Sequence, residues 1–262
     1  MKKIIQEDRK CSGCGACYNA CPTNAISMQQ NEEGFLYPVV DETKCSNCGL
    51  CKNICPVINL TYKNKSIPKC YAFKATNKIR QKSTSGGAFA VLAKHFIENE
   101  GYVAGAIWTD DFLVKHIVSN KIEDIEKMKK SKYLQSEIGD CYKKIKQLLE
   151  SNIKVLFSGT PCQVAGLKAY LKKDYDNLFS LDLVCHGVPS SKVFQKYLQE
   201  LLDNNEQILS FDFRHKKKNS DYKNTNINNT NYVKIITNKK INEECYSNNS
   251  FTKLIDISND LW

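Results

Sequence analysis

The chain has 262 residues, of which 42% are hydrophobic and 25% charged, and it carries a formal net charge of +10. These fractions are those of a globular protein and exclude a wholly disordered chain. No apolar run is long enough to cross a bilayer, and residues 6–9 (QEDR) interrupt the start before an export signal forms, so we expect a cytoplasmic protein without a membrane span. Thirteen cysteines, an odd number in such a chain, favour metal binding over disulfides.

The first 55 residues contain eight of these cysteines, in two copies of one motif. Residues 11–22 read CSGCGACYNACP and residues 45–56 read CSNCGLCKNICP. Both have the spacing C-x2-C-x2-C-x3-C-P of bacterial ferredoxins with two [4Fe–4S] clusters. The alternative is a pair of zinc sites, but zinc ribbons use paired C-x2-C knuckles rather than four cysteines followed by proline. We therefore predict an α+β ferredoxin-like domain with two clusters over residues 1–62.

The spacing also predicts which cysteines share a cluster. Three thiolates within seven residues can surround one cluster, while the fourth begins a helix that directs it toward the other cluster. The predicted ligand sets are therefore crossed: Cys11, Cys14, Cys17 and Cys55 for the first cluster, and Cys45, Cys48, Cys51 and Cys21 for the second. Gly15 and Gly49 allow backbone N–H groups to approach the sulfides. Between the runs we expect two short strands, Ala25–Met28 and Phe35–Val39, joined by a turn.

After a polar linker near residues 64–69, strand and helix patterns alternate. Strands are predicted at Tyr102–Trp108, Phe112–Val118, Ile153–Phe157 and Leu178–Val184. Helices are predicted at Ala88–Glu98, Ile122–Lys130, Tyr142–Glu150, Gln163–Leu171 and Lys192–Leu202. This alternation favours an α/β domain with a partly parallel sheet over residues 70–213.

Three turns of this domain are candidate sites. Residues 83–87 (STSGG) precede a helix and would expose N–H groups to a phosphate, although an ordinary helix cap is the alternative. Thr160 and Gln163 form a capping box, which leaves Cys162 at a helix N-terminus where a thiolate is favoured. Cys185 follows the next strand, so it and Cys162 are expected at the ligand-binding edge of the sheet; two buried apolar thiols are the alternative.

The four histidines are less informative. His186 lies in the third turn, residues 185–189 (CHGVP), and fits either a ligand role or a structural hydrogen bond. His95 and His116 lie within predicted elements and are interpreted as core or surface fillers. His215 lies in a basic run and is expected to be solvated.

Four segments together resemble the coenzyme F420 hydrogenase/dehydrogenase beta-subunit family of iron–sulfur flavoproteins. They are residues 82–87 (KSTSGG), 131–136 (SKYLQS), 159–163 (GTPCQ) and 182–190 (DLVCHGVPS). The resemblance covers about residues 1–213, because many members also carry a two-cluster ferredoxin module. It implies an FAD site with these candidate residues: Ser83, Thr84, Ser85, Gly86, Gly87, Lys132, Gln135, Ser136, Gly159, Thr160, Gln163 and His186.

The resemblance implies an oxidoreductase that passes electrons between a deazaflavin-type donor, with coenzyme F420 as the candidate substrate, FAD and [4Fe–4S] clusters. A flavin suits this work because it exchanges one or two electrons, whereas each cluster carries one. A non-catalytic electron-transfer subunit of a larger complex is the alternative, and a zinc-bearing nucleic-acid-binding protein is a third. The expected partner is a redox protein or another subunit of the complex.

Some family members carry a third cluster, with ligands matching Cys162, Cys185 and a later C-x2-C pair. Here Cys245 stands alone, with Asn248 in place of the second cysteine. Three thiolates from Cys162, Cys185 and Cys245 are one interpretation. We favour the other, in which the pair is a remnant and the N-terminal clusters carry all the iron.

The last predicted region is a basic, asparagine-rich and truncated segment over residues 214–262. Residues 214–240 contain eight Lys or Arg residues and one acidic residue. Such a composition is typical of a solvated or disordered loop. A patch for an acidic electron carrier or anionic coenzyme is the alternative. Nucleic-acid binding is not expected, because no recognised motif accompanies the charge.

Overall fold

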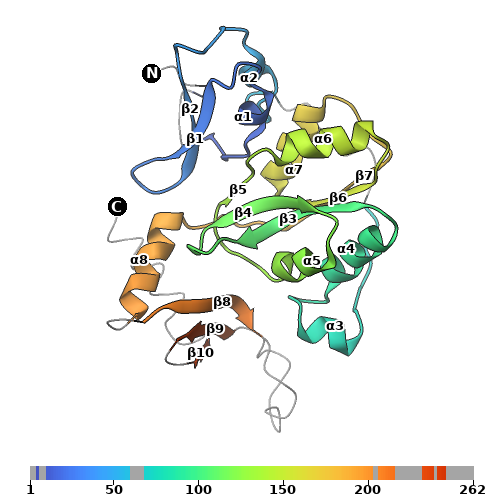
Figure 1. Cartoon of the computed structure of the whole chain (residues 1–262), viewed down its shortest axis with the longest axis vertical. Coiled ribbons are helices and arrows are strands. Elements are labelled where there is room, and N and C mark those ends of the chain that lie inside the picture. Colours follow the sequence, from blue (N-terminus) through green and yellow to red (C-terminus); the bar gives the residue numbers. More distant parts are fainter. Residues whose placement is uncertain are drawn as a thin grey trace.

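The computed structural model describes residues 4–5, 10–59, 68–202, 206–215, 232–238 and 241–245. Three parts follow one another along the longest axis of the molecule (Figure 1). A small cysteine-rich module lies at one end, an α/β layer lies in the middle, and a helix with a three-stranded sheet lies at the other end. None of the described helices is long and apolar enough to cross a bilayer.

The cysteine-rich module consists of α1 (Ala16–Ala20), β1 (Ile26–Gln30), β2 (Leu36–Val40) and α2 (Leu50–Asn53). The strands pair antiparallel, with Ile26 opposite Val40. The turn between them is closed by the Asn31 side chain, whose Oδ1 accepts a hydrogen bond from the Phe35 N–H at 2.8 Å. The hairpin lies within two residues of the predicted strands, because its turn chemistry and alternation are both local.

The central layer is a five-stranded sheet of order β5-β4-β3-β6-β7. Its strands are β3 (Tyr102–Trp108), β4 (Val114–Ser119), β5 (Ser136–Glu137), β6 (Val155–Gly159) and β7 (Leu178–Asp182). The strands β3, β6 and β7 run parallel, whereas β4 forms an antiparallel hairpin with β3. This arrangement confirms the predicted partly parallel sheet. The end of β6, the start of β5 and the end of β7 therefore meet at one edge of the sheet.

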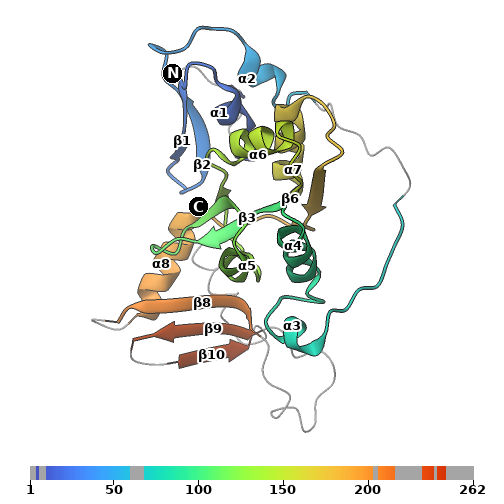
Figure 2. The same ribbon diagram turned by 45° about the vertical axis from the view of Figure 1, so that its right-hand side comes forward.

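Helices cover both faces of this sheet (Figures 1 and 2). The helices α4 (Ala88–Glu98) and α5 (Ile122–Met128) pack on one face, against Val103 and Leu156. The helices α6 (Cys141–Glu150) and α7 (Pro161–Leu171) pack on the other, against a core that includes Ala104, Val155 and Phe157. Neighbouring strand residues point to opposite faces, which is why each strand contributes to both cores. A short helix, α3 (Asn77–Gln81), precedes α4.

The far end contains α8 (Ser191–Leu201) and a sheet of order β10-β9-β8, with β8 at Ile208–His215, β9 at Tyr232–Thr237 and β10 at Ile241–Cys245. A cluster of aromatic rings from Trp108, Phe194, Phe211 and Phe213 joins this sheet to α8 and to β3. Aromatic residues of this size contribute much of the buried apolar area.

The predicted C-terminal loop is wrong where β9 and β10 form. In β9, Val233 and Ile235 are both buried against the aromatic cluster, and their alternation is hidden among lysines and asparagines in the sequence. The strand β8 also continues past residue 213, and its last residue, His215, is half-buried and lies 3.5 Å from a carboxylate oxygen of Asp212 rather than solvated. Residues 216–231 and 246–262 lie outside the described residues.

Candidate metal centres

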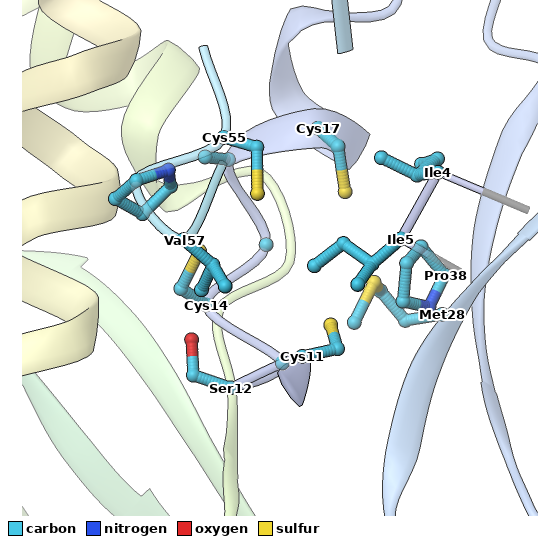
Figure 3. Close-up of a pocket in the computed structure, with 14 residues that line it drawn as sticks. Ile4, Ile5, Cys11, Ser12, Cys14, Cys17, Met28, Pro38, Cys55 and Val57 are labelled. Carbon is cyan, nitrogen blue, oxygen red and sulfur yellow. The ribbon is translucent and has the colours of Figure 1, made fainter. Parts of the chain in front are cut away.

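Four cysteines from the two runs surround one cavity. Cys11, Cys14 and Cys17 of the first run and Cys55 of the second line it together with apolar residues, among them Ile4, Ile5 and Val57. Figure 3 shows the four sulfur atoms directed into the same space. The structure thus brings the last cysteine of the second run to the first three cysteines of the first run.

Local backbone geometry produces this arrangement. Gly15 is the N-cap of α1 and adopts a left-handed conformation (φ 73°), as Gly49 does at the start of α2 (φ 73°). This conformation is accessible to glycine without the penalty that a Cβ imposes, so the chain can turn sharply between the second and third cysteines of each run. In the first run this turn accompanies the placement of Cys11, Cys14 and Cys17 around one cavity.

The cavity is shielded from water. Cys14, Cys17 and Cys55 are each less than one tenth exposed. Burial raises the pKa of Cys14 to about 12, against a hydrogen bond from the Ala16 backbone, and burial also raises the pKa of Cys17. Buried thiols of this kind ionise when metal charge compensates them, so these three together with the half-buried Cys11 around an apolar cavity fit an iron–sulfur cluster. In the described part of the chain, no three His, Cys, Asp or Glu residues form a group suited to a single ion.

The other four cysteines form a second, more exposed group. Cys21, Cys45 and Cys51 are half-buried, and Cys48 is exposed. Cys21, Cys45 and Cys51 all pack against the same small core, formed by Ile4, Cys17, Ile26 and Val40. A backbone hydrogen bond from Leu50 lowers the pKa of Cys48. Burial raises the pKa of Cys51. Cys21 therefore belongs to the environment of the second run.

The module is fastened to the central layer beside the first cavity. The Tyr142 hydroxyl of α6 lies 2.8 Å from the carbonyl oxygen of Cys14. The Asn19 side chain donates to the Gly139 carbonyl at 2.8 Å. The Gln135 amide pairs with the backbone of Leu36 in β2, accepting from its N–H at 2.6 Å and donating to its carbonyl at 3.1 Å. These bonds fix the cysteine-rich module against α6 and against residues 135–139 before it.

The residues proposed for FAD and the remaining cysteine candidates fall into three places. The first is the turn at residues 83–87, where the Thr84 hydroxyl accepts a hydrogen bond from the Ser131 N–H at 3.1 Å. Two of the resemblance segments therefore lie side by side. The glycines of this turn have packing roles: a Cβ on Gly86 would lie 2.5 Å from the Phe73 carbonyl oxygen, and one on Gly87 would lie 3.2 Å from Ala75. Ser83 is buried and donates to the Ile79 carbonyl, whereas Ser85 is exposed.

The second place is the interior of the sheet edge, where polar side chains already form hydrogen bonds within the protein. Gln163 completes the capping box with Thr160, as predicted, and also donates to the Ser136 carbonyl. Lys132 donates to three carbonyls at the end of α5, and burial lowers its pKa to about 8. Gly159, at the end of β6, is buried above the Phe157 ring. The Gln135 amide is also engaged, since it binds the cysteine-rich module.

His116 also lies at this edge of the sheet. Its sequence context predicts a core or surface filler. Its Nε2–H donates to the Ser158 carbonyl at 3.1 Å, so Nδ1 accepts from the Ser136 hydroxyl at 2.6 Å. Burial lowers the pKa of His116 to about 4, which keeps the ring neutral. The ring also stacks on Phe157. Its strand position gave no signal of this network, because its partners lie 20 and 42 residues away along the chain.

The third place holds the remaining cysteine candidates. Cys162 is half-buried at the N-terminus of α7, with its sulfur 3.2 Å from the Thr160 hydroxyl, and it interacts electrostatically with Cys14. Cys185 and His186 are exposed just after β7. Cys245 ends β10, in the other sheet. Cys162 is thus beside the first cavity, whereas Cys245 belongs to a different layer.

Two family models match separate regions of the chain. Residues 10–59 match the 4Fe-4S dicluster domain, and residues 153–258 match the C terminus of the coenzyme F420 hydrogenase/dehydrogenase beta subunit. The coenzyme F420-dependent sulfite reductase of Methanocaldococcus jannaschii is 29% identical over 216 residues, which is 79% of this chain and 33% of that protein. An uncharacterized protein of the same organism is 28% identical over 212 residues, which is 68% of this chain and 57% of that protein.

The chain therefore spans less than two thirds of either relative. One solved structure, a chain of the F420-reducing [NiFe] hydrogenase complex from Methanosarcina barkeri, superimposes with a TM-score of 0.44 at 19% identity, covering 66% of this chain and 59% of that chain. With a dicluster module whose cysteines surround a buried cavity, followed by a region similar to the C terminus of the coenzyme F420 hydrogenase/dehydrogenase beta subunit, the chain is related to iron–sulfur electron-transfer oxidoreductases of that kind.

Proposed function

We propose that the chain is an iron–sulfur flavoprotein oxidoreductase that carries electrons between a deazaflavin-type donor, FAD and two [4Fe–4S] clusters. The observation that supports this most is the cavity shared by Cys55 and the first three cysteines of the other run. Its place against the central layer puts a redox centre beside the domain in which the family relationship suggests a flavin.

The proposed ligand sets are crossed. Cys11, Cys14, Cys17 and Cys55 hold the first cluster, and Cys21, Cys45, Cys48 and Cys51 hold the second. The first set is mostly buried and adjoins α7, while the second is half-buried to exposed. We infer that the first cluster exchanges electrons with the central layer and the second with a redox partner protein or another subunit.

The FAD site is proposed at the sheet edge between the Thr84–Ser131 contact, Thr160 and His186. Thr84, Ser131 and Thr160 are only partly buried and His186 is exposed, so a ligand at this edge can reach them. FAD supplies the exchange between two-electron and one-electron chemistry. The donor class, a reduced deazaflavin such as coenzyme F420, follows from the family relationship.

The third cysteine site is proposed to be a remnant. Cys162 lies beside the first cavity, and Cys245 ends a strand of the other sheet. Two clusters then account for all the iron, about eight atoms per chain. About twelve irons, falling when Cys162 is changed to Ser, would show that a third cluster exists.

The test is anaerobic purification with iron, labile sulfide, zinc and flavin quantified per chain. We expect about eight irons, a similar amount of sulfide and about one FAD. The purified chain is then mixed with a reduced deazaflavin and an artificial one-electron acceptor. Turnover supports the enzyme, whereas intact clusters without turnover favour the non-catalytic subunit. Zinc without sulfide would contradict both.

A further inference from the structure

The helix α7 contains a glycine at a position where alanine would favour the helix. Gly166 lies in the middle of Pro161–Leu171 and is buried. A glycine in a helix interior costs about 1 kcal/mol relative to alanine. The structure supplies a reason for it: an added Cβ would lie 3.0 Å from the Cys14 sulfur, 3.1 Å from the Cys14 Cβ and 3.1 Å from the Tyr142 hydroxyl oxygen. An alanine methyl group would fit here only if Cys14 or Tyr142 moved by a few tenths of an ångström.

Tyr142 completes the contact from the neighbouring helix. The residue is fully buried, and its hydroxyl lies 2.8 Å from two carbonyl oxygens, those of Cys14 and Gln163. The single hydroxyl proton is therefore shared between the loop that carries Cys14 and the first turn of α7. A buried hydrogen bond of this kind fixes the backbone of the cysteine relative to the helix.

Tyr142 also connects this contact to the interior of the sheet. Its ring packs edge-on against Phe157, with the centroids 6.0 Å apart. Phe157 in turn stacks on His116, with the centroids 5.6 Å apart. Packed rings and hydrogen bonds thus lead from Cys14 to the buried sheet edge where FAD is proposed.

We propose that Tyr142 is a positioning residue for the first cluster, acting through Cys14, and that Gly166 provides the close approach that this requires. The inference rests on the proposed function, since it assigns Cys14 to an iron–sulfur cluster. Hydrogen bonds around a cluster help set its reduction potential. The O–H dipole that points at the Cys14 loop favours the added negative charge of the reduced cluster. The central layer therefore shifts the reduction potential of the first cluster and leaves the potential of the second unchanged.

The test is the Tyr142→Phe variant, which removes the hydroxyl and keeps the ring. Tyr170→Phe is the matched control, because Tyr170 packs in the same core, with its ring 6.1 Å from that of Tyr142, and lies near Lys146. Both clusters are reduced stepwise under anaerobic conditions and followed by electron paramagnetic resonance. A Cys21→Ser background, which removes the second cluster, identifies the signal of the first.

We expect the first-cluster potential of Tyr142→Phe to become more negative, with the second-cluster potential unchanged and Tyr170→Phe like wild type. Loss of the first cluster alone also supports the inference. An unchanged first-cluster potential, or the same shift in Tyr170→Phe, overturns it. A wild-type chain without clusters would instead overturn the proposed function, so the two failures are distinguishable.

Gly166→Ala provides an independent test of the proposal if Tyr142→Phe yields no folded protein. We expect the first cluster to be lost or its potential to shift, even though alanine favours the helix. Gly105→Ala is the control, because its Cβ would meet the flexible Met128 side chain, on the other face of the sheet. An unchanged first cluster in Gly166→Ala overturns the proposal.

Discussion

The two cysteine runs have nearly the same sequence and the same local geometry but different surroundings. Gly15 and Gly49 both begin a short helix with φ 73°. A Cβ on Gly15 would lie 3.2 Å from Ile138 of the central layer, whereas one on Gly49 would have nothing within 4 Å. The first run is packed against another domain, and the second faces solvent. Equal motifs therefore produce an inner and an outer centre.

The difference shows that docking, rather than the motif, makes the two centres inequivalent. Solvent exposure and nearby hydrogen bonds both shift the potential of a cluster. Two clusters held in these different surroundings would therefore differ in reduction potential and in what can reach them. The following changes test whether this asymmetry is real.

The largest effects are expected from the two crossing cysteines. Cys55→Ser should remove the buried cluster and leave the exposed one, because Cys55 lines the first cavity. Cys21→Ser should do the reverse. Each variant should retain about four irons per chain, with one of two electron paramagnetic resonance signals. If Cys21→Ser abolishes the signal that Cys14→Ser also abolishes, the ligation is not crossed.

The second-largest effect is expected from oxidation, which should remove one cluster before the other. Limited oxidation of the holoprotein should remove the exposed cluster first, because oxidation of thiolates and sulfides follows exposure. Iron content should fall toward about half before the buried cluster is affected. The measurement is iron release together with the two signals over time. Simultaneous loss of both signals would contradict the asymmetry.

A smaller effect is expected at the repeated asparagines. Asn19 is buried and donates to the carbonyls of Gly15 and Gly139, whereas Asn53 is exposed. Asn19→Ala removes the side-chain bond to the partly buried Gly139 carbonyl, while the Gly15 carbonyl keeps its bond from the residue 19 backbone N–H, and the change should reduce stability by about 1–3 kcal/mol. Asn53→Ala should change it by less than about 0.5 kcal/mol. Anaerobic melting temperatures compare the two, and equal values would indicate that the docking contact contributes little.

The smallest difference is expected at the glycines that begin the helices. Alanine at either position adopts a strained left-handed conformation, at a cost of about 1–2 kcal/mol. Gly15→Ala also presses on Ile138, which should add about 1 kcal/mol or more from overpacking. The melting temperature of Gly15→Ala should therefore lie below that of Gly49→Ala. Equal melting temperatures would show that Ile138 moves aside at no cost in stability.

Where the sequence has strong local patterns, the elements could be predicted closely. The bounds of β3 and α4 agree with the prediction to the residue, and the capping box of Thr160 and Gln163 forms as its spacing indicates. The strand β9 could not be predicted, because its residues Val233 and Ile235 become buried only against Phe211 and Phe213 from another part of the chain.

The candidate FAD residues show that side-chain contacts, too, could not be predicted from the sequence. The resemblance places Gln135 and Lys132 at a cofactor site, but their polar groups bind Leu36 and the end of α5. His116, which the pattern treated as a filler, bonds to Ser136 and Ser158. Hydrogen bonds across such sequence distances depend on which elements become neighbours, and no local pattern reports that.

The sequence alone determined the cysteine spacing, the left-handed glycines and the alternation of strands and helices, because these depend on residues within one or two turns of each other. The tertiary structure decided that one cysteine set is buried beside α7 and the other exposed. It also gave Gly166 and Tyr142 their roles, since both depend on the approach of Cys14, more than 120 residues earlier in the chain. Packing of distant segments is a property of the whole fold, and it makes two similar motifs into different centres.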